Sequence, residues 1–373
     1  MKTVGIICEY NPFHNGHRLH MEEARRATGA EYVICAMSGS WVQRGEPTIV
    51  DKWTRARAAL GHGADLVLEL PTAWAVRAAG DFAAGGVALL YGLGVCTHLS
   101  FGSELPLAAL ERELGMEEDA DAVRQALSSG QSYPRAVSGN RPVFPPNAVL
   151  GVEYLRALRA LNSDMVPIAI QRNVPHDTGT LAEVTSASRI RRGIAAGEDV
   201  SFALPDGALQ EALTAQEGSA NWERLAPLVL RRLRNALPEE LRQAYGVSEG
   251  MEHRILRAAE SAASVMELFD TIKCKRYTHA RIRRAIAHIL LGISEETRTQ
   301  TPSYARVLGF KKASAPLLRE IERRADFPLI TKVPREIGDP LLATDVFAQE
   351  LWALSCPIPI KKGMDYVHPI VIV

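Results

Sequence analysis

The feature that most restricts the fold is the alternation of short apolar runs with amphipathic stretches over the first 172 residues. The apolar runs are continuous, as strands buried on both faces of a parallel sheet require, and the stretches between them have helical spacing. Such alternation with short links predicts an α/β fold with right-handed crossovers, which binds ligands at the carboxyl ends of its parallel strands. We predict strands over residues 3–8, 31–38, 64–71, 97–104 and 165–172, and helices over residues 17–28, 51–61, 74–91 and 145–161.

The second half of the chain has a different pattern, in which the apolar spacing is mainly helical. Short strands are predicted there only over residues 327–332 and 366–373. Gly and Pro interrupt the pattern between residues 195 and 210. A length of 373 residues also favours two domains. We therefore predict a sheet domain over residues 1–200 and a mainly helical domain over residues 201–373.

The composition argues against several classes of protein. The formal net charge is zero, so a nucleic acid must bind to a local basic patch rather than to the whole surface. The five cysteines are scattered and form no Cys-x-x-Cys pair, which argues against a disulfide framework and a cysteine zinc site. No apolar stretch reaches about 18 residues, and no secretory leader precedes the first strand. We expect a cytoplasmic protein that does not contact a membrane.

Three histidines follow the first predicted strand in the segment NPFHNGHRLH. Helical metal sites usually place ligands at i and i+4, whereas His14, His17 and His20 are spaced by three, so we predict no metal site. A helix that begins at Gly16 directs free N–H groups and its dipole at an anion, and glycine allows a close approach. His14 and His17 can donate hydrogen bonds to phosphate oxygens, which indicates a nucleotide site. The alternative is that these histidines are merely solvated.

The segment HNGH at residues 14–17 resembles the HxGH signature of nucleotidyltransferases and class I synthetases. The segment TSASRIR at residues 185–191 is similar to the second nucleotidyltransferase signature, ISSTxIR, and follows the fifth predicted strand as that signature does. Two motifs in the right order are more specific than either motif alone. In the functional interpretation, Ser186, Ser188 and Arg191 hold the β- and γ-phosphates. Alternatively, one serine caps a helix and the arginines are solvated.

Longer segments resemble one family, the bacterial tRNA(Met) cytidine acetate ligases. They include CEYNPFHNGH, VQRGEP, SFGSE, PPNAVLGVEYLRAL, KRYTHARIRRAIAHILLG and YARVLGF, so the likeness runs from residue 1 to beyond residue 310. The resemblance implies a Rossmann-like HUP/nucleotidyltransferase sheet followed by a mainly helical domain. It also implies an enzyme that activates acetate with ATP as acetyl-adenylate and releases pyrophosphate. The second step forms N4-acetylcytidine at the wobble position of elongator tRNA(Met), without acetyl-CoA.

The resemblance also implies which residues form the site. His14, His17 and Arg191 are the predicted catalytic residues, since they would neutralise charge on the α-phosphate and on the leaving pyrophosphate. Mg²⁺ is expected with ATP, held by phosphates and water rather than by a dedicated protein site. The local alternatives are a turn at Gly102, a helix cap at Asn147 and a surface charge at Arg172. The predicted ATP-binding residues are Ile7, Cys8, Glu9, Tyr10, Asn11, Pro12, Phe13, His14, Asn15, Gly16, His17, Arg18, Leu19, His20, Gly102, Asn147, Arg172, Ser186 and Ser188.

A basic segment lies in the second half of the chain. Residues 271–284 contain six Lys or Arg, one Tyr, and no Asp or Glu. Such a run favours a phosphate backbone, and an aromatic ring within it can stack on a base. The alternative is a solvated helix face opposite a core stripe formed by Ile282, Ile286, Ile289 and Ile293. With the resemblance, we predict that tRNA contacts Lys275, Arg276, Tyr277, Arg281 and Arg284.

Three functions remain compatible with the sequence. The favoured one is the tRNA-modifying acetate ligase. The second is a nucleotidyltransferase that adenylylates a small metabolite, and the third is a non-catalytic RNA-binding protein. The two intact signatures argue against the third function, and the basic segment favours the first over the second. The oligomeric state stays open, as does whether Arg44 and Glu46 position tRNA, order a lid or form a local ion pair.

Overall fold

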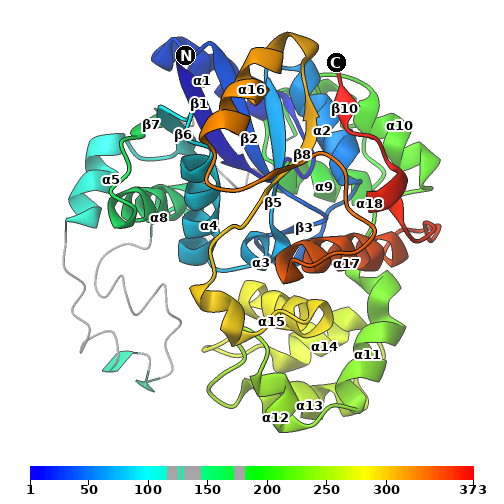
Figure 1. Ribbon diagram of the computed structural model, residues 1–373. Coiled ribbons are helices and arrows are strands. Elements are labelled where there is room, and N and C mark those ends of the chain that lie inside the picture. The colour runs from blue at the N-terminus through cyan, green and yellow to red at the C-terminus, as the bar shows by residue number, and fades with distance from the viewer. Residues whose placement is uncertain (116–124, 127, 130–143, 172–180) are drawn as a thin grey trace.

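The structure is a computed structural model that describes residues 1–115, 125–126, 128–129, 144–171 and 181–373. A sheet with helices on both faces forms one part of the molecule, and a group of helices lies beside it (Figure 1). Helix α17 (Pro340–Leu354) runs along the boundary between these parts (Figure 1). The α/β class predicted from the sequence is confirmed. No helix within the described ranges is long and apolar enough to cross a membrane.

The main sheet contains, among the described residues, the strands β1 (Thr3–Cys8), β2 (Tyr32–Ser38), β5 (Leu66–Leu70), β6 (His98–Ser103), β7 (Val166–Gln171), β8 (Ala305–Phe310), β9 (Leu329–Ile330) and β10 (Val371–Ile372). Their order is β10-β8-β5-β2-β1-β6-β7, with β9 paired to β8. A separate hairpin pairs β3 (Trp41–Val42) with β4 (Glu46–Pro47). The strand order of the main sheet reverses between β1 and β6, and such a switch point leaves a crevice for a ligand at the carboxyl ends of the two strands.

Around the sheet lie α1 (Asn15–Thr28), α2 (Lys52–Gly61), α3 (Thr72–Ala75), α4 (Ala79–Gly92), α5 (Leu107–Leu114), α8 (Pro146–Ala160), α9 (Ala187–Ala195), α10 (Ala208–Ala215), α16 (Ala315–Arg324) and α18 (Met364–Val367). The helical region contains α11 (Ala226–Arg234), α12 (Pro238–Arg242), α13 (Met251–Ser261), α14 (Val265–Ile272) and α15 (His279–Leu291). The single helix predicted over residues 74–91 is wrong, because the chain breaks between α3 and α4. Tertiary contacts hold this break: the carbonyl of Val76 lies 3.0 Å from His288 Nε2, and Arg77 packs over the ring of Tyr245.

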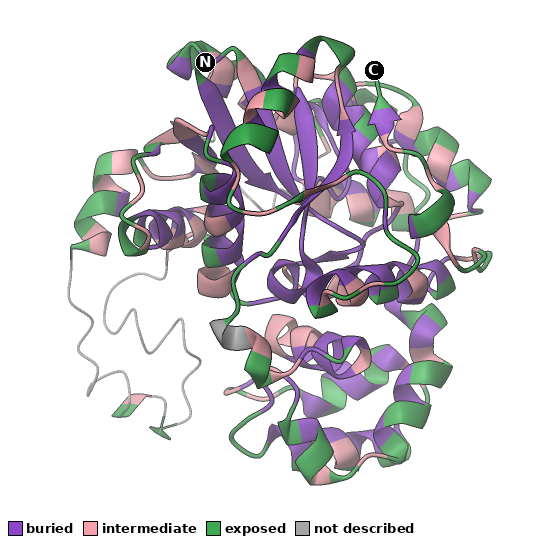
Figure 2. Ribbon diagram, in the orientation of Figure 1, coloured by how far each residue is buried: buried purple, intermediate pink, exposed green. Residues whose placement is uncertain are grey.

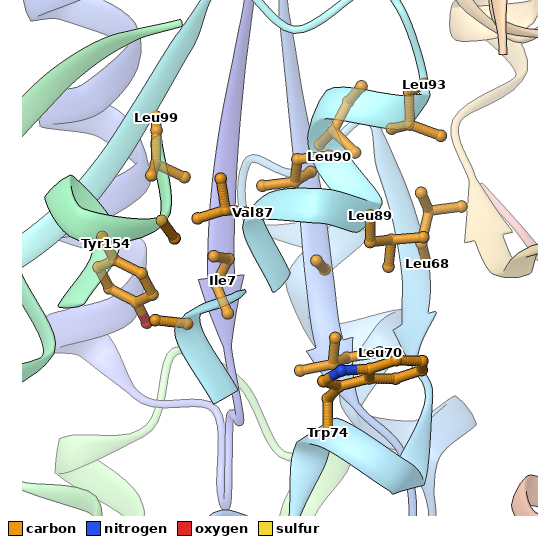
Figure 3. Close-up of a cluster of buried hydrophobic side chains, with 14 of the residues drawn as sticks. Ile7, Leu68, Leu70, Trp74, Val87, Leu89, Leu90, Leu93, Leu99 and Tyr154 are labelled. Atoms are coloured by element: carbon orange, nitrogen blue, oxygen red, sulfur yellow. The ribbon is translucent and has the colours of Figure 1, made fainter. Parts of the chain in front are cut away.

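Alternate residues of the central strands point to opposite faces of the sheet, as the twofold period of a strand requires. Ile6 of β1 lies in a core with α1 and α2, while its neighbour Ile7 lies in a core with α4 and α8. Figure 3 shows this second core, in which Ile7 and Leu68 from the strands meet Val87 and Leu90 from α4. Helices therefore cover both faces of the central strands, which are buried along their length, whereas the edge strand β7 is half-buried with exposed ends.

The sheet takes three of its strands from the second half of the chain. β8 pairs antiparallel with β5, and β9 and β10 pair parallel with β8, so the expectation of a wholly parallel sheet is corrected at one pair. Strand β8 was not predicted, because Arg306 interrupts its apolar pattern. The structure buries this arginine in ion pairs with Glu69 of β5 (3.0 Å) and with Asp365 (2.6 Å). The division of the chain at residue 200 stays a prediction, but the chain returns to the sheet after the helical region.

The helical region has its own apolar core, which lies between α11, α13, α14 and α15 and extends to α17. Trp41 and Val76 from the sheet part belong to the same core, so apolar contacts attach the two parts of the molecule. Figure 2 shows the buried faces of these helices turned inward and the exposed faces turned outward. The predicted core stripe is confirmed, since the structure buries Ile282, Ile286, Ile289 and Ile293.

Candidate functional site

The loop after β1 turns sharply before α1 begins. Tyr10 has a φ of 49°, and the bond between Asn11 and Pro12 is cis. His14 is the N-cap of α1, and its Nδ1 accepts a hydrogen bond from the backbone N–H of Gly16 at 3.1 Å. The neutral tautomer that accepts at Nδ1 carries its hydrogen on Nε2, so the ring is also a hydrogen-bond donor. His14 is thereby held at the N-terminus of α1, where the helix dipole favours an anion.

The ring of His17 stacks on the ring of His14. Their centroids are 3.7 Å apart, and the ring planes differ by 29°. Tyr10 and Phe13 lie on other sides of His17, with centroid distances of 4.7 Å and 5.7 Å. Because these contacts restrict the rotation of both imidazoles, the structure presents the two histidines predicted to be catalytic as a rigid pair.

Gly16 and His20 complete the first motif. A Cβ at position 16 would lie 2.9 Å from Cε1 of His14, so only glycine lets the histidine ring fold over the start of the helix. His20 lies one turn further along α1, and its Nε2 is 3.0 Å from the hydroxyl of Ser100 in β6. This contact ties α1 to the strand on the far side of the switch point.

Asn15 joins the first motif to the second. Its side-chain Nδ2 donates to the carbonyls of Glu183 and Phe202, both at 3.1 Å, and the residue is only 5% exposed. The sequence predicted that Asn15 contacts ATP, whereas both of its amide hydrogens are used by protein carbonyls. Sequence reasoning missed this role because the two partners are 168 and 187 residues away.

The second motif forms the start of α9. Ser186 is its N-cap, and its hydroxyl accepts a hydrogen bond from the backbone N–H of Arg189 at 3.2 Å. The alternative prediction that a serine caps a helix is therefore confirmed at this position. The Arg189 side chain pairs with Glu198 at 2.7 Å. Arg189 is thus directed away from the first motif, and we do not place it among the phosphate ligands.

Arg191 reaches from α9 to the loop after β1. It donates to the carbonyl of Asn11 at 2.7 Å and lies 3.4 Å from the hydroxyl of Ser188. Burial lowers the pKa of the Arg191 guanidinium, and the carboxylates of Glu46 and Glu9 oppose this effect. The structure therefore brings the HNGH and TSASRIR motifs together at the carboxyl end of β1.

The end of β6 forms the other side of the switch point. Gly102 lies within β6 and pairs with Ile170, so the prediction of a turn at this glycine is wrong. The prediction that Asn147 caps α8 is also wrong, because Glu104 caps this helix by accepting from the backbone N–H of Ala148 at 3.0 Å. Asn147 Nδ2 donates to the same carboxylate at 2.7 Å. Arg172, a predicted ATP ligand, lies outside the described residues.

Arg55 in α2 is a member of the site that sequence reasoning missed. It is 1% exposed and donates to the carbonyls of Glu9 at 2.7 Å and Ser38 at 3.0 Å, and it also contacts the carbonyl of Gly39. Burial lowers its pKa to about 10. Because these carbonyls follow β1 and β2, Arg55 fixes the carboxyl ends of two neighbouring strands. The sequence carries no signal for this role, because the segment DKWTRARAAL has two arginines, of which Arg55 is buried and Arg57 is exposed.

Tyr277 does not have the role that the sequence predicted. It is 4% exposed, packs in the helical core, and donates its hydroxyl hydrogen to the carbonyl of Glu249 at 2.7 Å. The prediction that its ring stacks on a base is therefore wrong. The basic segment over residues 271–284 is also not one helix, since α14 ends at Ile272 and α15 begins at His279.

The other four predicted tRNA ligands lie on or before α15. Lys275 is exposed and Arg276 is half-buried. Arg281 pairs with Glu249 at 3.2 Å. Arg284 is half-buried, and burial lowers its pKa to about 10. Lys275 and Arg276 thus lie in the loop before α15, and Arg281 and Arg284 lie in the first two turns of this helix. A short basic segment of this kind favours a phosphate backbone.

Comparisons with known proteins agree over the full length of the chain. The model of a family described as HIGH Nucleotidyl Transferase matches residues 1–364. Proteins named tRNA(Met) cytidine acetate ligase from Acetivibrio thermocellus and Thermoanaerobacter sp. are 35% and 36% identical. A protein of the same name from Limosilactobacillus reuteri is 35% identical. In all three comparisons the match covers 100% of this chain and 100% of the relative.

Solved structures show the same arrangement. The structure of Thermotoga maritima TmcAL bound with alpha-thio ATP has a TM-score of 0.90 and 28% identity to this chain. The apo form of that protein has a TM-score of 0.91 and 28% identity. Each match covers 100% of both chains, so the likeness includes the helical region as well as the sheet.

Proposed function

The chain belongs to the HIGH nucleotidyl transferase family, and from this membership we propose that it is an ATP-dependent tRNA(Met) cytidine acetate ligase. Relatives with this name match it from end to end, and the similar T. maritima protein binds an ATP analogue. The observation that carries the proposal is a pair of contacts that bring the two motifs together: Asn15 of HNGH binds the carbonyl of Glu183, just before TSASRIR, and Arg191 of TSASRIR binds the carbonyl of Asn11, just before HNGH. Together they place a helix N-terminus, two histidines and an arginine at one strand end, which suits a triphosphate.

In the first step, an oxygen of acetate attacks the α-phosphorus of ATP. A bond forms between that oxygen and phosphorus, and the bond to the β-phosphate oxygen breaks, so that pyrophosphate leaves with its electron pair. His14 and His17 donate hydrogen bonds to the α-phosphate as its charge grows. Arg191 holds the leaving pyrophosphate. Because the stacked histidine rings and the half-buried Arg191 are already in place, little reorganisation accompanies the reaction.

In the second step, N4 of the wobble cytidine attacks the carbonyl carbon of acetyl-adenylate. The new carbon–nitrogen bond forms as AMP leaves, and N4 loses one proton. Neither step needs a covalent bond to the protein, so the side chains act by positioning and by charge neutralisation. This agrees with the position of Cys8 at the end of β1, where burial raises the pKa of the thiol and so disfavours the reactive thiolate.

Mg²⁺ accompanies ATP in this proposal. Within the described ranges, no three or more His, Cys, Asp or Glu side chains are grouped to hold a metal ion. Glu9 is the acidic side chain in the loop after β1, but it accepts a hydrogen bond from Gln43 and burial raises its pKa. We therefore propose that phosphate oxygens and water hold the ion, as they often do for Mg²⁺. The bound ion would supply positive charge to the phosphates.

The function is tested with labelled acetate, ATP and tRNA(Met), in the absence of acetyl-CoA. The proposal predicts acetate-dependent exchange of labelled pyrophosphate into ATP without tRNA, and labelled acetate on tRNA(Met) when tRNA is added. Bound ATP with neither exchange nor labelled tRNA would instead support a nucleotidyltransferase that acts on a small metabolite.

The tRNA surface is tested separately. We propose that Lys275, Arg276 and Arg281 contact the phosphate backbone, because they belong to the basic segment around the start of α15 and none of them is fully buried. Replacing all three with Ala should abolish tRNA acetylation and leave pyrophosphate exchange in the absence of tRNA intact. Unchanged acetylation would show that tRNA binds elsewhere. The salt dependence of tRNA affinity should also become weaker in the triple variant, since fewer phosphates are neutralised.

A further inference from the structure

The β3–β4 hairpin contacts both the ATP site and the helical region. On one side, the backbone N–H of Gln43 donates to the Glu9 carboxylate in the loop after β1 at 2.7 Å. On the other side, the carbonyl of Gly45 accepts a hydrogen bond from Trp222 Nε1 at 2.9 Å. Trp222 belongs to the core of the helical region. The hairpin is therefore a direct physical link between the two parts of the molecule.

The tip of the hairpin is packed closely against α15. Gly45 has a φ of +70°, and a Cβ at this position would lie 2.5 Å from the backbone nitrogen of Arg284. Only glycine allows both this backbone conformation and this approach. The next residue, Glu46, is consequently held at the same place relative to α15.

Glu46 shares its carboxylate between two arginines from different parts of the protein. One oxygen pairs directly with Arg283 of α15, and the other lies 3.9 Å from Arg191 of α9. The side chains of Glu46, Arg191 and Arg283 are 22%, 23% and 24% exposed, so water screens these charges only partly. Arg191 is a proposed pyrophosphate ligand, and Arg283 lies in the basic segment of the helical region.

One carboxylate cannot neutralise both arginines fully. When a phosphate group takes Arg191, Glu46 is left to pair with Arg283 alone, and Arg283 becomes a weaker ligand for another phosphate. When a phosphate of RNA takes Arg283, Glu46 pairs with Arg191 and competes with the phosphates of ATP. Each ligand thus moves the Glu46 carboxylate onto the arginine that the other ligand needs. The two ligands therefore weaken each other's binding, and by the same factor.

We propose that Glu46 is a positioning residue that couples the ATP site negatively to RNA binding on α15. This inference rests on the proposed function, because that function assigns Arg191 to pyrophosphate and brings tRNA to the basic segment in which Arg283 lies. Departure of pyrophosphate returns Arg191 to Glu46 and releases Arg283 for the RNA backbone. The shared carboxylate thus favours adenylate formation before tRNA binds to Arg283.

The experiment measures the dissociation constant of ATP in the full-length protein, with Mg²⁺ and without acetate, in the absence and presence of saturating tRNA(Met). Without acetate no adenylate forms, so binding is at equilibrium. In the wild type, tRNA should weaken ATP binding about fivefold, at the lower end of typical coupling between sites. In Glu46→Gln, which keeps the shape and removes the charge, the two dissociation constants should agree within about 1.5-fold.

Two further variants keep the test decisive. Arg283→Met removes the arginine that shares Glu46 with Arg191. It should therefore also abolish the coupling between ATP and tRNA, and it provides a test even if Glu46→Gln folds poorly. Glu249→Gln is the matched control. Glu249 pairs at 3.2 Å with Arg281, which lies on α15 as Arg283 does, but Glu249 does not pair with Arg191. This variant should keep the fivefold ratio. A wild-type ratio of one, a tightening of ATP binding by tRNA, or an unchanged ratio in Glu46→Gln would overturn the proposal.

Pyrophosphate exchange separates this inference from the proposed function. Acetate-dependent exchange and tRNA acetylation in a wild type that shows no coupling would refute only the role of Glu46. Coupling that disappears in Glu46→Gln, in a protein that activates no acetate, would refute the ligase assignment and leave the shared carboxylate in place.

Discussion

Replacing Asn15 tests whether the HNGH and TSASRIR segments must be held together for the ATP site to be active. Its amide donates two hydrogen bonds to main-chain carbonyls in a position that is 5% exposed. Asn15→Ala removes both bonds, each of which contributes about 0.5–1.5 kcal/mol. We therefore expect the free energy of unfolding to fall by about 1–3 kcal/mol. Asn15→Asp has the same shape but places an oxygen where the amide donates, so we expect a larger loss than for Ala.

Two measurements on the same protein samples check this reasoning: denaturant unfolding and acetate-dependent pyrophosphate exchange. In Asn15→Ala the segment before α9 is no longer held, so Arg191 loses its alignment with the loop after β1. A loss of about 1.4 kcal/mol in transition-state stabilisation corresponds to a tenfold fall in kcat/KM, and we expect a fall of at least about this size.

Asn235→Ala is the matched control. The Asn235 amide also donates to a carbonyl, that of Arg231 at 2.8 Å, but the residue is exposed. Its replacement should change the free energy of unfolding by less than about 0.5 kcal/mol. The reasoning is refuted if Asn15→Ala resembles this control in both measurements. A loss of stability without a loss of exchange would mean that Asn15 supports the fold and does not position the site.

Three further predictions follow from the same structure. His17→Ala should slow adenylate formation more than it weakens ATP binding, because its hydrogen bond is strongest in the transition state; equal losses in single-turnover rate and ATP affinity would exclude that role. Tyr277→Phe should lower the free energy of unfolding by about 1 kcal/mol and leave tRNA affinity within about twofold, whereas a large loss of tRNA affinity would contradict the structural role of this tyrosine. Burial raises the pKa of the Asp345 carboxyl well above its ordinary value, to about 7, so the contribution of this group to stability is complete below about pH 4 and is lost as the pH rises through about 7. Asp345→Asn should therefore gain stability relative to the wild type between about pH 5 and pH 8, and parallel denaturation curves across that range would exclude this titration.

The local parts of the site follow patterns that the sequence displays directly. The strand predicted over residues 3–8 and the ends of the helices predicted at residues 28 and 61 are confirmed. Each depends on residues within a few positions along the chain: a continuous apolar run in β1, a left-handed residue at Gly29 after α1, and a side chain of Asp51 that accepts from the N–H of Thr54 at the start of α2. The placement of HNGH after a strand and at the start of a helix follows from the same local rules.

Other features of the site depend on residues that the sequence places far apart. Asn15 binds carbonyls more than 160 residues away, and Glu46 meets Arg283 across 237 residues. No local pattern marks these pairs, because a polar side chain in a loop can be solvated, can bind a ligand or can bind the protein with the same sequence around it. Strand β8 is a similar case, since the apolar pattern broken by Arg306 becomes a buried strand only when Glu69 and Asp365 supply opposite charges.

Tyr277 shows why a local sequence pattern and the tertiary structure can assign different roles to the same residue. A tyrosine among basic residues is compatible with stacking on a base and with burial, and composition does not distinguish them. Burial follows from the packing of α13, α14 and α15 and from an acceptor at Glu249, both of which arise only when the helices assemble. The sequence is sufficient for the strands of the first half of the chain, for the serine cap of α9 and for the placement of the HNGH motif, because short-range sterics and hydrogen bonds determine them. The pairing of distant charges and amides requires the assembled fold, because it depends on which surfaces the packing of the whole chain brings into contact.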